Sequence, residues 1–288
     1  LSKNLQDAGA IIIAKTQLTE LANWVASGMP GNYNGLNGYG MNPWDPRMDP
    51  RDNNFDGRPV MGTGGSSSGT GTNMNFWIGN VGTETSGSIL SPSNANMLVG
   101  IKPTVGRVSR YGVIPITADQ DTPGPMTRNV SDAAIMLGAM ESPAGDPKDS
   151  ATFKCPPPAA RDYTRFLNPK GLAGARIGIP RAFFYDSTAA GATRPRGGLN
   201  PAQRRAMDEA IAVLKAQGAI IVDPADIPSV IEQNAAAASG KKADLQALVS
   251  KGQTWQVVIY VWAGWALVAA LAAALLCNAR GQGDKVTR

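Results

Sequence analysis

The 288-residue chain contains no histidine, and this absence removes several kinds of chemistry from consideration. Without histidine the chain cannot itself supply a Ser-His-Asp triad or a Cys-His pair, and it lacks the commonest protein metal ligand. Its two cysteines, Cys155 and Cys277, are too few for a disulfide framework or a cysteine-based metal site. We expect no metal ion and no cofactor.

Charged residues are also scarce, at 17% of the chain, and they give a net charge of +5. The positive residues are scattered and form no dense basic run, a pattern typical of solubility, so we expect no nucleic-acid partner. Apolar residues make up 43%, beside 33 glycines and 21 prolines, which is typical of a loop-rich globular protein. The length allows one large core or two modest ones.

The first sixty residues alternate between helical and strand-like patterns before a long loop begins. Residues 1–8 predict a helix that ends at Gly9, and the run AIIIA at residues 10–14 predicts a buried strand. Helical spacing resumes over residues 18–25. Residues 28–65 are rich in Gly, Asn, Pro and Asp, which predicts a long irregular loop.

Similar signals recur in the second half of the chain. Residues 129–140 predict a helix with Asn129 or Ser131 as its N-cap.

Further along, residues 176–179 (RIGI) predict a short strand. Asn200-Pro201 supplies an N-cap and a first-turn proline for another helix, Gly218 ends that helix, and residues 219–222 (AIIV) predict the next strand. This alternation predicts an α/β fold with crossover helices.

The character of the chain changes after residue 231, so we predict one domain over residues 1–231 and a divergent tail over residues 232–288. Residues 257–277 carry no charge over 21 positions, eight of which are alanine. Two interpretations stay open: a membrane-spanning helix, or a helix buried in protein. The chain is expected to be cytoplasmic by default, and membrane-associated if residues 257–277 insert.

Two clusters of small residues stand out, GGSSSG at residues 64–69 and GTETSGSI at residues 82–89. A run such as GGSSSG is by itself more often a flexible linker than a site. The small residues around Ser88, however, let the backbone turn so that several N–H groups face one point, as an oxyanion hole requires. In a histidine-free chain the hydroxyl needs a lysine, a carboxylate or a second serine to take its proton.

Five segments, in this order, resemble the amidase signature family and together cover about residues 1–230. They are residues 8–16, 64–69 (GGSSSG), 82–89 (GTETSGSI), 100–107 (GIKPTVGR) and 110–126, which begin RYGVIP and end DTPGPM. Five motifs in the family's order are far more specific than a single GxSxG.

The resemblance implies an α/β/α sandwich around a mixed twisted sheet, with an atypical helical C-terminal segment in this chain. It implies a Ser-Ser-Lys triad that cleaves a carboxylic amide C–N bond, other than an ordinary peptide bond, through an acyl-serine. The nucleophile then falls on Ser88 and the bridging serine, held by a cis peptide, on Ser66. Its oxyanion hole falls on the backbone N–H groups of Thr85, Ser86, Gly87 and Ser88.

The chain departs from the family in three ways. The family's lysine lies upstream of the segment matching residues 10–15 and thus before residue 1, so we expect this chain alone to be inactive. The serine spacing leaves Ser67 as a second candidate for the bridge, and Ser86 stands where the family often has glycine.

Two alternatives remain beside hydrolysis of a small-molecule amide. The chain could be a catalytically dead scaffold, or a membrane-anchored fragment of an amidase. The resemblance also leaves the amide open, because small aliphatic, peptide C-terminal, fatty-acyl and aminoacyl substrates all occur on this scaffold.

Overall fold

The computed structural model describes residues 1–23, 32–41, 69–154, 156–187, 197–228 and 230–231. They form two compact units, the first ending at Leu167 and the second beginning at Asn168. The predicted tail of residues 232–288 lies outside the described residues, so the nature of residues 257–277 stays a prediction. Within the described ranges, no helix is long and apolar enough to cross a membrane.

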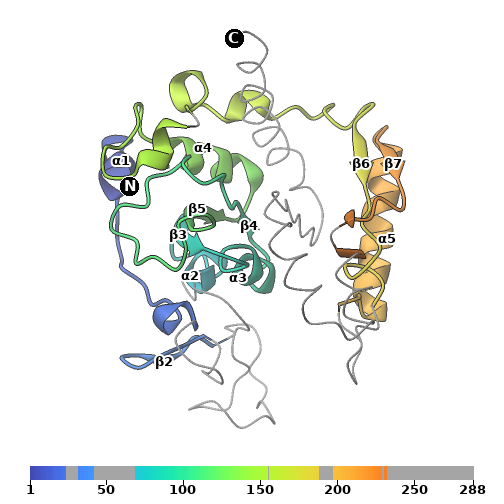
Figure 1. Ribbon diagram of the computed structural model, residues 1–288, viewed down its shortest axis with the longest axis horizontal. Coiled ribbons are helices and arrows are strands. Elements are labelled where there is room, and N and C mark those ends of the chain that lie inside the picture. The colour runs from blue at the N-terminus through green and yellow to red at the C-terminus, as the bar shows by residue number, and fades with distance from the viewer. Residues whose placement is uncertain (24–31, 42–68, 155, 188–196, 229, 232–288) are drawn as a thin grey trace. The chain divides into compact units, whose positions relative to one another are not determined.

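The first unit is built on a three-stranded antiparallel sheet. Its strands are β3 (Gly79–Glu84), β5 (Thr122–Thr127) and β4 (Val99–Gly100), in the order β3-β5-β4. Figure 1 shows helix α4 (Val130–Met140) on one side of this sheet, and helices α2 (Gly69–Asn73) and α3 (Leu90–Ala95) on the other. The unit therefore has three layers, helix on sheet on helix.

The central strand β5 is buried along its whole length, and a glycine makes this packing possible. Gly124 lies opposite Gly82 in the β3–β5 register. A Cβ atom at Gly124 would lie 2.1 Å from the carbonyl oxygen of Ile101, well inside van der Waals contact. Only a residue without a side chain allows the chain after β4 to pass this close to β5.

Helix α4 begins where the sequence predicts it. Asn129 is the N-cap, and its side-chain oxygen accepts a hydrogen bond from the Asp132 backbone N–H at 2.8 Å. This decides between the two predicted caps in favour of Asn129, whose oxygen satisfies one of the helix's four free N–H groups.

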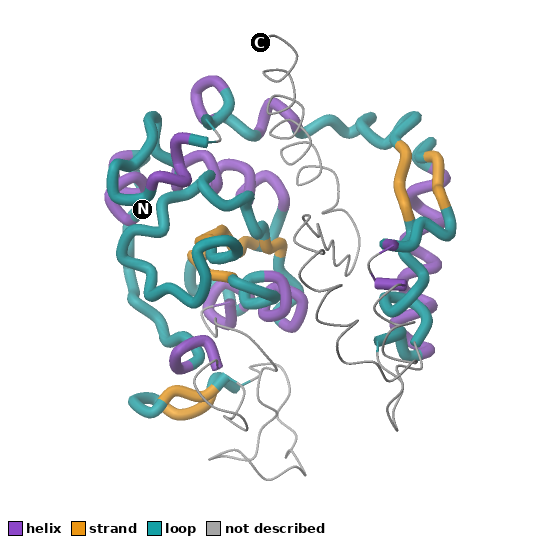
Figure 2. The backbone as a smooth tube through the Cα atoms, viewed as in Figure 1, coloured by secondary structure: helices purple, strands orange, loops and turns teal. Residues whose placement is uncertain are grey.

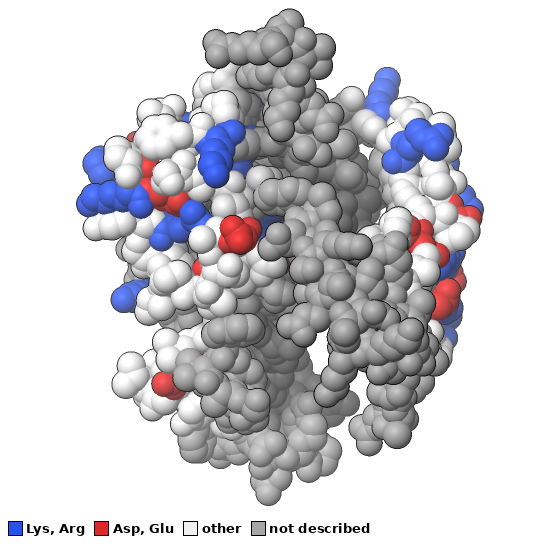
Figure 3. Space-filling model, in the orientation of Figure 1, with Lys and Arg blue, Asp and Glu red and all other residues white. Residues whose placement is uncertain are grey.

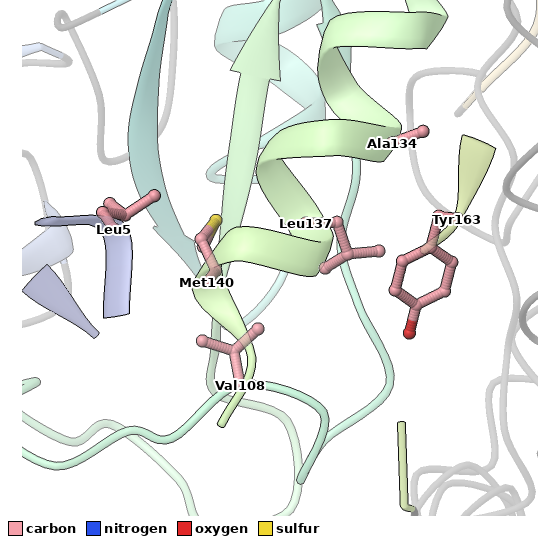
Figure 4. Close-up of a cluster of buried hydrophobic side chains, with 6 residues drawn as sticks. All are labelled: Leu5, Val108, Ala134, Leu137, Met140 and Tyr163. Carbon is pink, nitrogen blue, oxygen red and sulfur yellow. The ribbon is translucent and has the colours of Figure 1, made fainter. Parts of the chain in front are cut away.

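The buried face of α4 forms the core of the first unit (Figure 4), with side chains from α1 (Ser2–Asp7), from α4 and from two loops. The cluster consists of Leu5, Val108, Ala134, Leu137, Met140 and Tyr163. A hydrogen bond of 3.0 Å from the Asn4 side chain to the Met140 carbonyl joins α1 to the end of α4.

The strand predicted at residues 10–14 is wrong. The segment has no β-strand hydrogen bonding in the structure, and Ile11, Ile12 and Ile13 are 87%, 49% and 62% exposed. An apolar run becomes a strand only when a neighbouring strand satisfies its backbone groups, and no strand among the described residues pairs with this one.

The helix predicted over residues 18–25 is also mostly absent from the part that is described. A short 3₁₀ segment, η1 (Glu20–Asn23), stands there, and Leu21 and Ala22 have the positive φ angles of 44° and 53°. Left-handed backbone at two successive residues cannot continue an α-helix.

A small hairpin lies inside the predicted long loop (Figure 2). Strands β1 (Tyr33–Asn34) and β2 (Gly38–Tyr39) pair antiparallel. After α4, the first unit continues with three short 3₁₀ segments: η2 (Ser150–Phe153), η3 (Ala159–Arg161) and η4 (Thr164–Phe166).

The second unit follows the sequence prediction closely. Strand β6 (Arg176–Gly178) pairs in parallel with β7 (Ile220–Val222), and α5 (Pro201–Ala216) connects them. Asn200 and Gln203 form a reciprocal capping box at the start of α5. The buried core of the second unit consists of Ile179, Tyr185 and Ile211. Antiparallel and parallel sheets therefore occur in one chain, and the predicted mixed α/β class is confirmed.

Candidate functional site

Residues 85–88, which we call the serine loop, connect strand β3 to helix α3. Glu84, the last residue of β3, holds the far end of this loop. Its carboxylate Oε2 accepts hydrogen bonds from the backbone N–H groups of Ile89 at 2.7 Å and Leu90 at 2.9 Å. The Glu84 residue is only 4% exposed. Because one side chain connects the end of the strand to the start of the helix, the four residues between them must turn back sharply.

A second carboxylate holds the near end of the serine loop. The Thr85 hydroxyl donates to Asp121 Oδ1 at 2.5 Å, and Asp121 is 6% exposed. The other oxygen, Oδ2, accepts from the N–H groups of Ile116 at 2.7 Å and Thr117 at 2.9 Å. Asp121 therefore fastens the loop to the segment that leads into β5, and two carboxylates fix its two ends.

The residue after Ser88 anchors the serine loop in the core. Ile89 is fully buried. A Cβ atom placed on Gly124 would lie 2.8 Å from Ile89 Cδ1, and one placed on Gly100 would lie 3.1 Å from Ile89 Cγ2. Ile89 thus packs directly on the bare backbone of β4 and β5, and Ser88 is covalently joined to that anchor.

The backbone of the serine loop has the features that anion binding requires. Gly87 has a φ of +91°, and its carbonyl accepts the Ser91 N–H at 2.7 Å. Across the described ranges, the N–H groups of Ser86 and Gly87 donate no hydrogen bond to the protein. Ser86 is exposed and Ser88 is half-buried. Two N–H groups beside a reachable serine can bind an oxygen atom that carries negative charge.

One lysine contacts the segment that carries Asp121. Lys102 is half-buried, and its ammonium donates to the Gln120 carbonyl at 2.8 Å. Burial lowers the pKa of Lys102, while the charges of Glu84 and Asp121 act in the opposite direction. The lysines upstream of the loop differ, since Lys15 is exposed and Lys3 pairs with Asp7 at 2.6 Å on the surface of α1.

The structure describes one part of the predicted site and leaves another out. Thr85, Ser86, Gly87 and Ser88 lie together between β3 and α3, whereas residues 64–68, which include Ser66 and Ser67, lie outside the described residues. The distance from either of these two serines to Ser88 therefore stays a prediction.

Sequence reasoning missed the three charged residues that surround the loop: Glu84, Asp121 and Lys102. Each of them lies inside a motif, Glu84 in GTETSGSI, Lys102 in GIKPTVGR and Asp121 in the segment that ends DTPGPM, but nothing in these motifs indicates that the three residues lie near one another. Among the described residues, no group of three His, Cys, Asp or Glu side chains could hold a metal ion. On the face shown in Figure 3, positive and negative side chains of the described residues are interspersed.

Comparison with known proteins assigns the chain to a family. The family model named Amidase matches residues 1–250. The chain belongs to the Amidase family. A glutamyl-tRNA(Gln) amidotransferase subunit from Geobacter sp. (strain M21) is 39% identical over 220 residues, which are 75% of this chain and 38% of that protein. A probable amidase from Arabidopsis thaliana is 34% identical over 231 residues, or 79% of this chain and 38% of that protein.

Solved amidase structures share the fold of this chain. The peptide amidase from Stenotrophomonas maltophilia superposes with a TM-score of 0.63 at 29% identity, over 99% of this chain and 52% of that one. An amidase family protein from Bacillus anthracis str. Ames gives a TM-score of 0.64 at 28% identity, over 99% and 49%. The predicted amidase signature fold is thus confirmed, and the chain spans about half the length of these amidases.

Proposed function

We propose that the chain carries the nucleophile and the oxyanion-binding loop of a hydrolase that cleaves small-molecule carboxylic amides at C–N bonds other than ordinary peptide bonds. One observation carries the proposal. The serine loop is fixed at both ends by buried carboxylates, while the N–H groups of Ser86 and Gly87 stay unused by the described part of the protein. A loop held in advance, with free donors beside a serine, meets the demands of acyl transfer.

In the proposed reaction, Ser88 Oγ attacks the amide carbonyl carbon while its proton passes to Ser66, or to Ser67, whose own proton passes to a lysine. The carbonyl oxygen becomes an oxyanion that accepts hydrogen bonds from the N–H groups of residues 85–88. The C–N bond then breaks, and the leaving nitrogen takes a proton back along the same path. Water attacks the acyl-serine and releases the carboxylic acid.

The proposal assigns the base to the lysine that, by the family resemblance, lies upstream of the segment matching residues 10–15. Lys3 and Lys15 are exposed, and Lys102 is occupied with the Gln120 carbonyl. A serine hydroxyl without a base is a poor nucleophile, so we expect the chain by itself to hydrolyse amides very slowly.

Chemical rescue tests this assignment. The chain is incubated with a fluorophosphonate probe and increasing concentrations of a small primary amine, which stands in for the lysine. We expect labelling of Ser88, located by mass spectrometry, to accelerate with the amine concentration and to vanish in Ser88→Ala. The matched control Ser131→Ala removes an exposed serine on α4 and should label like the parent chain.

Two results would count against the proposal. If the probe does not label Ser88 at any amine concentration, Ser88 cannot be activated as a nucleophile, and the alternative of a catalytically dead scaffold is favoured. If the chain without amine hydrolyses a simple amide at the rate of a complete amidase, another residue within residues 1–288 is the base.

A further inference from the structure

We propose that Lys102 is a positioning residue for the serine loop, acting through Glu84 and Asp121, the carboxylates that hold the loop's two ends. The contribution of Lys102 to catalysis rests on the function proposed above, whereas its effect on the structure of the serine loop can be measured without any reaction.

The arrangement of the three charges suggests this role. Glu84 fixes the loop's far end through Ile89 and Leu90, and Asp121 fixes its near end through Thr85. Both carboxylates are almost completely buried. The Lys102 ammonium donates to the carbonyl of Gln120, the residue before Asp121, and Glu84 lies opposite Thr122, the residue after Asp121, in the β3–β5 register. Lys102 is therefore placed to act on both carboxylates that hold the serine loop.

Two carboxylates taken out of water repel each other, and each loses most of its hydration. A nearby cation compensates both effects, and it does so more strongly in a half-buried position than at the surface, because water screens it less. Without that cation, the carboxylates are expected to move apart or towards solvent. Either movement stretches their hydrogen bonds to the loop.

The backbone around Lys102 fixes where its charge can lie. Lys102 follows β4 by two residues, in the segment that passes over Gly124, and its ammonium is held by the Gln120 carbonyl, next to Asp121. A simpler role therefore competes with the proposed one, since the lysine could merely tie this segment to residue 120 by a hydrogen bond.

Hydrogen–deuterium exchange on a set of four variants separates the two roles. Lys102→Met removes charge and donor, Lys102→Gln keeps a donor without charge, and Lys102→Arg keeps both. The matched control is Lys154→Met, which removes an exposed lysine in the same unit. The readout is the exchange rate of the Ile89 and Leu90 amides, with the amides of buried α4 residues as the internal reference.

We expect Lys102→Met and Lys102→Gln to raise exchange at Ile89 and Leu90 about tenfold or more while α4 is unchanged. Lys102→Arg and Lys154→Met should stay within about threefold of the parent chain. If Lys102→Gln behaves like the parent, the hydrogen bond matters and the charge does not, and the proposal is overturned. Equal acceleration at α4 would also overturn it, since the lysine would then support the whole unit.

The amine-rescued labelling of Ser88 supplies a second readout. Lys102→Met and Lys102→Gln should lower the labelling rate about tenfold, and Lys102→Arg should restore it. A labelling rate unchanged in Lys102→Met would contradict the positioning role. Failure of the parent chain to label would instead remove the proposed function and leave the exchange result to decide the role of Lys102.

Discussion

Two buried glutamates in the first unit, Glu84 and Glu141, have opposite surroundings. Glu84 ends a strand, and one of its carboxylate oxygens accepts two backbone N–H groups at the start of α3. Glu141 is the C-cap of α4, at the end of the helix where backbone carbonyls point outward. Both are at most 4% exposed. The free N–H groups of a helix start attract a carboxylate, and the free carbonyls of a helix end repel it.

The partners of Glu141 only partly compensate for its position. The Tyr163 hydroxyl donates to Glu141 Oε1 at 2.6 Å, and Arg107 Nε lies 3.4 Å from the same oxygen. Within the described part of the chain, Oε2 has no hydrogen-bond partner. Burial raises the pKa of Glu141, while the Tyr163 hydrogen bond and the charges of Arg107 and Arg161 counteract this rise.

The difference teaches that burial alone does not say what a carboxylate does. Glu84 fixes a neighbouring loop because it accepts hydrogen bonds from two backbone N–H groups, whereas burial raises the pKa of Glu141. Substitutions at the two sites should therefore have unequal effects.

The largest effect is expected for Glu84→Ala. It leaves the N–H groups of Ile89 and Leu90 without their acceptor, at about 1–3 kcal/mol each. We expect the free energy of unfolding to fall by about 3–5 kcal/mol in denaturant titrations, and amine-rescued labelling of Ser88 to be lost. A fall of less than about 1 kcal/mol would show that water replaces the carboxylate and that the loop does not depend on it.

Glu84→Gln should have an intermediate effect, because the amide oxygen can still accept a hydrogen bond but carries no full charge. Hydrogen bonds to charged groups are stronger than those between neutral groups. We expect a loss of about 1–2 kcal/mol in the same titrations, with faster amide exchange at Leu90. A loss as large as that of Glu84→Ala would mean that the amide cannot adopt the carboxylate's geometry.

A comparable or somewhat smaller loss, about 1–2 kcal/mol, is expected for Tyr163→Phe, which removes the hydroxyl donor to Glu141 Oε1 and keeps the ring in the core. The pKa of Glu141 should rise further, since a hydrogen bond that favours the charged form is lost. Unfolding at pH 5 and pH 8 measures both effects, and the loss should be larger at pH 8. An equal loss at both values would contradict the coupling.

Glu141→Gln should change stability least at low pH and flatten its dependence on pH. A pKa raised in the folded state means that folding favours the protonated acid. That contribution is fully present below the unfolded pKa of about 4.3 and declines as the pH rises through the folded pKa. Glutamine imitates the protonated form at every pH. We expect the variant to stay within about 1 kcal/mol of the parent at pH 4 and to lose less stability towards pH 8. Parallel pH curves for variant and parent would refute this.

Local signals predicted local structure well. Asn129 before α4, and Asn200-Pro201 before α5, are capping patterns whose partners lie three residues away, so the sequence contains the whole interaction. The strand expected at residues 10–14 failed because a strand depends on a partner elsewhere in the chain.

The same limit applies to the candidate site. Its small residues, Thr85 to Ser88, form one short motif and could be predicted together. Asp121 is separated from Thr85 by 36 positions, and no periodicity or spacing indicates that their side chains meet. Lys102 belongs to the motif GIKPTVGR, which the sequence shows, but its position near the carboxylates depends on how closely β4 and β5 pack.

The complete burial of Ile89, next to Ser88, has a consequence for the heat resistance of the site. A nucleophile on an exposed loop can be displaced by local fluctuations while the rest of the fold persists. Here the neighbouring residue packs against glycines of two paired strands, so Ser88 cannot move far unless the sheet itself opens. Loss of amine-rescued labelling of Ser88 on heating and melting of the first unit should therefore occur together, at the same temperature.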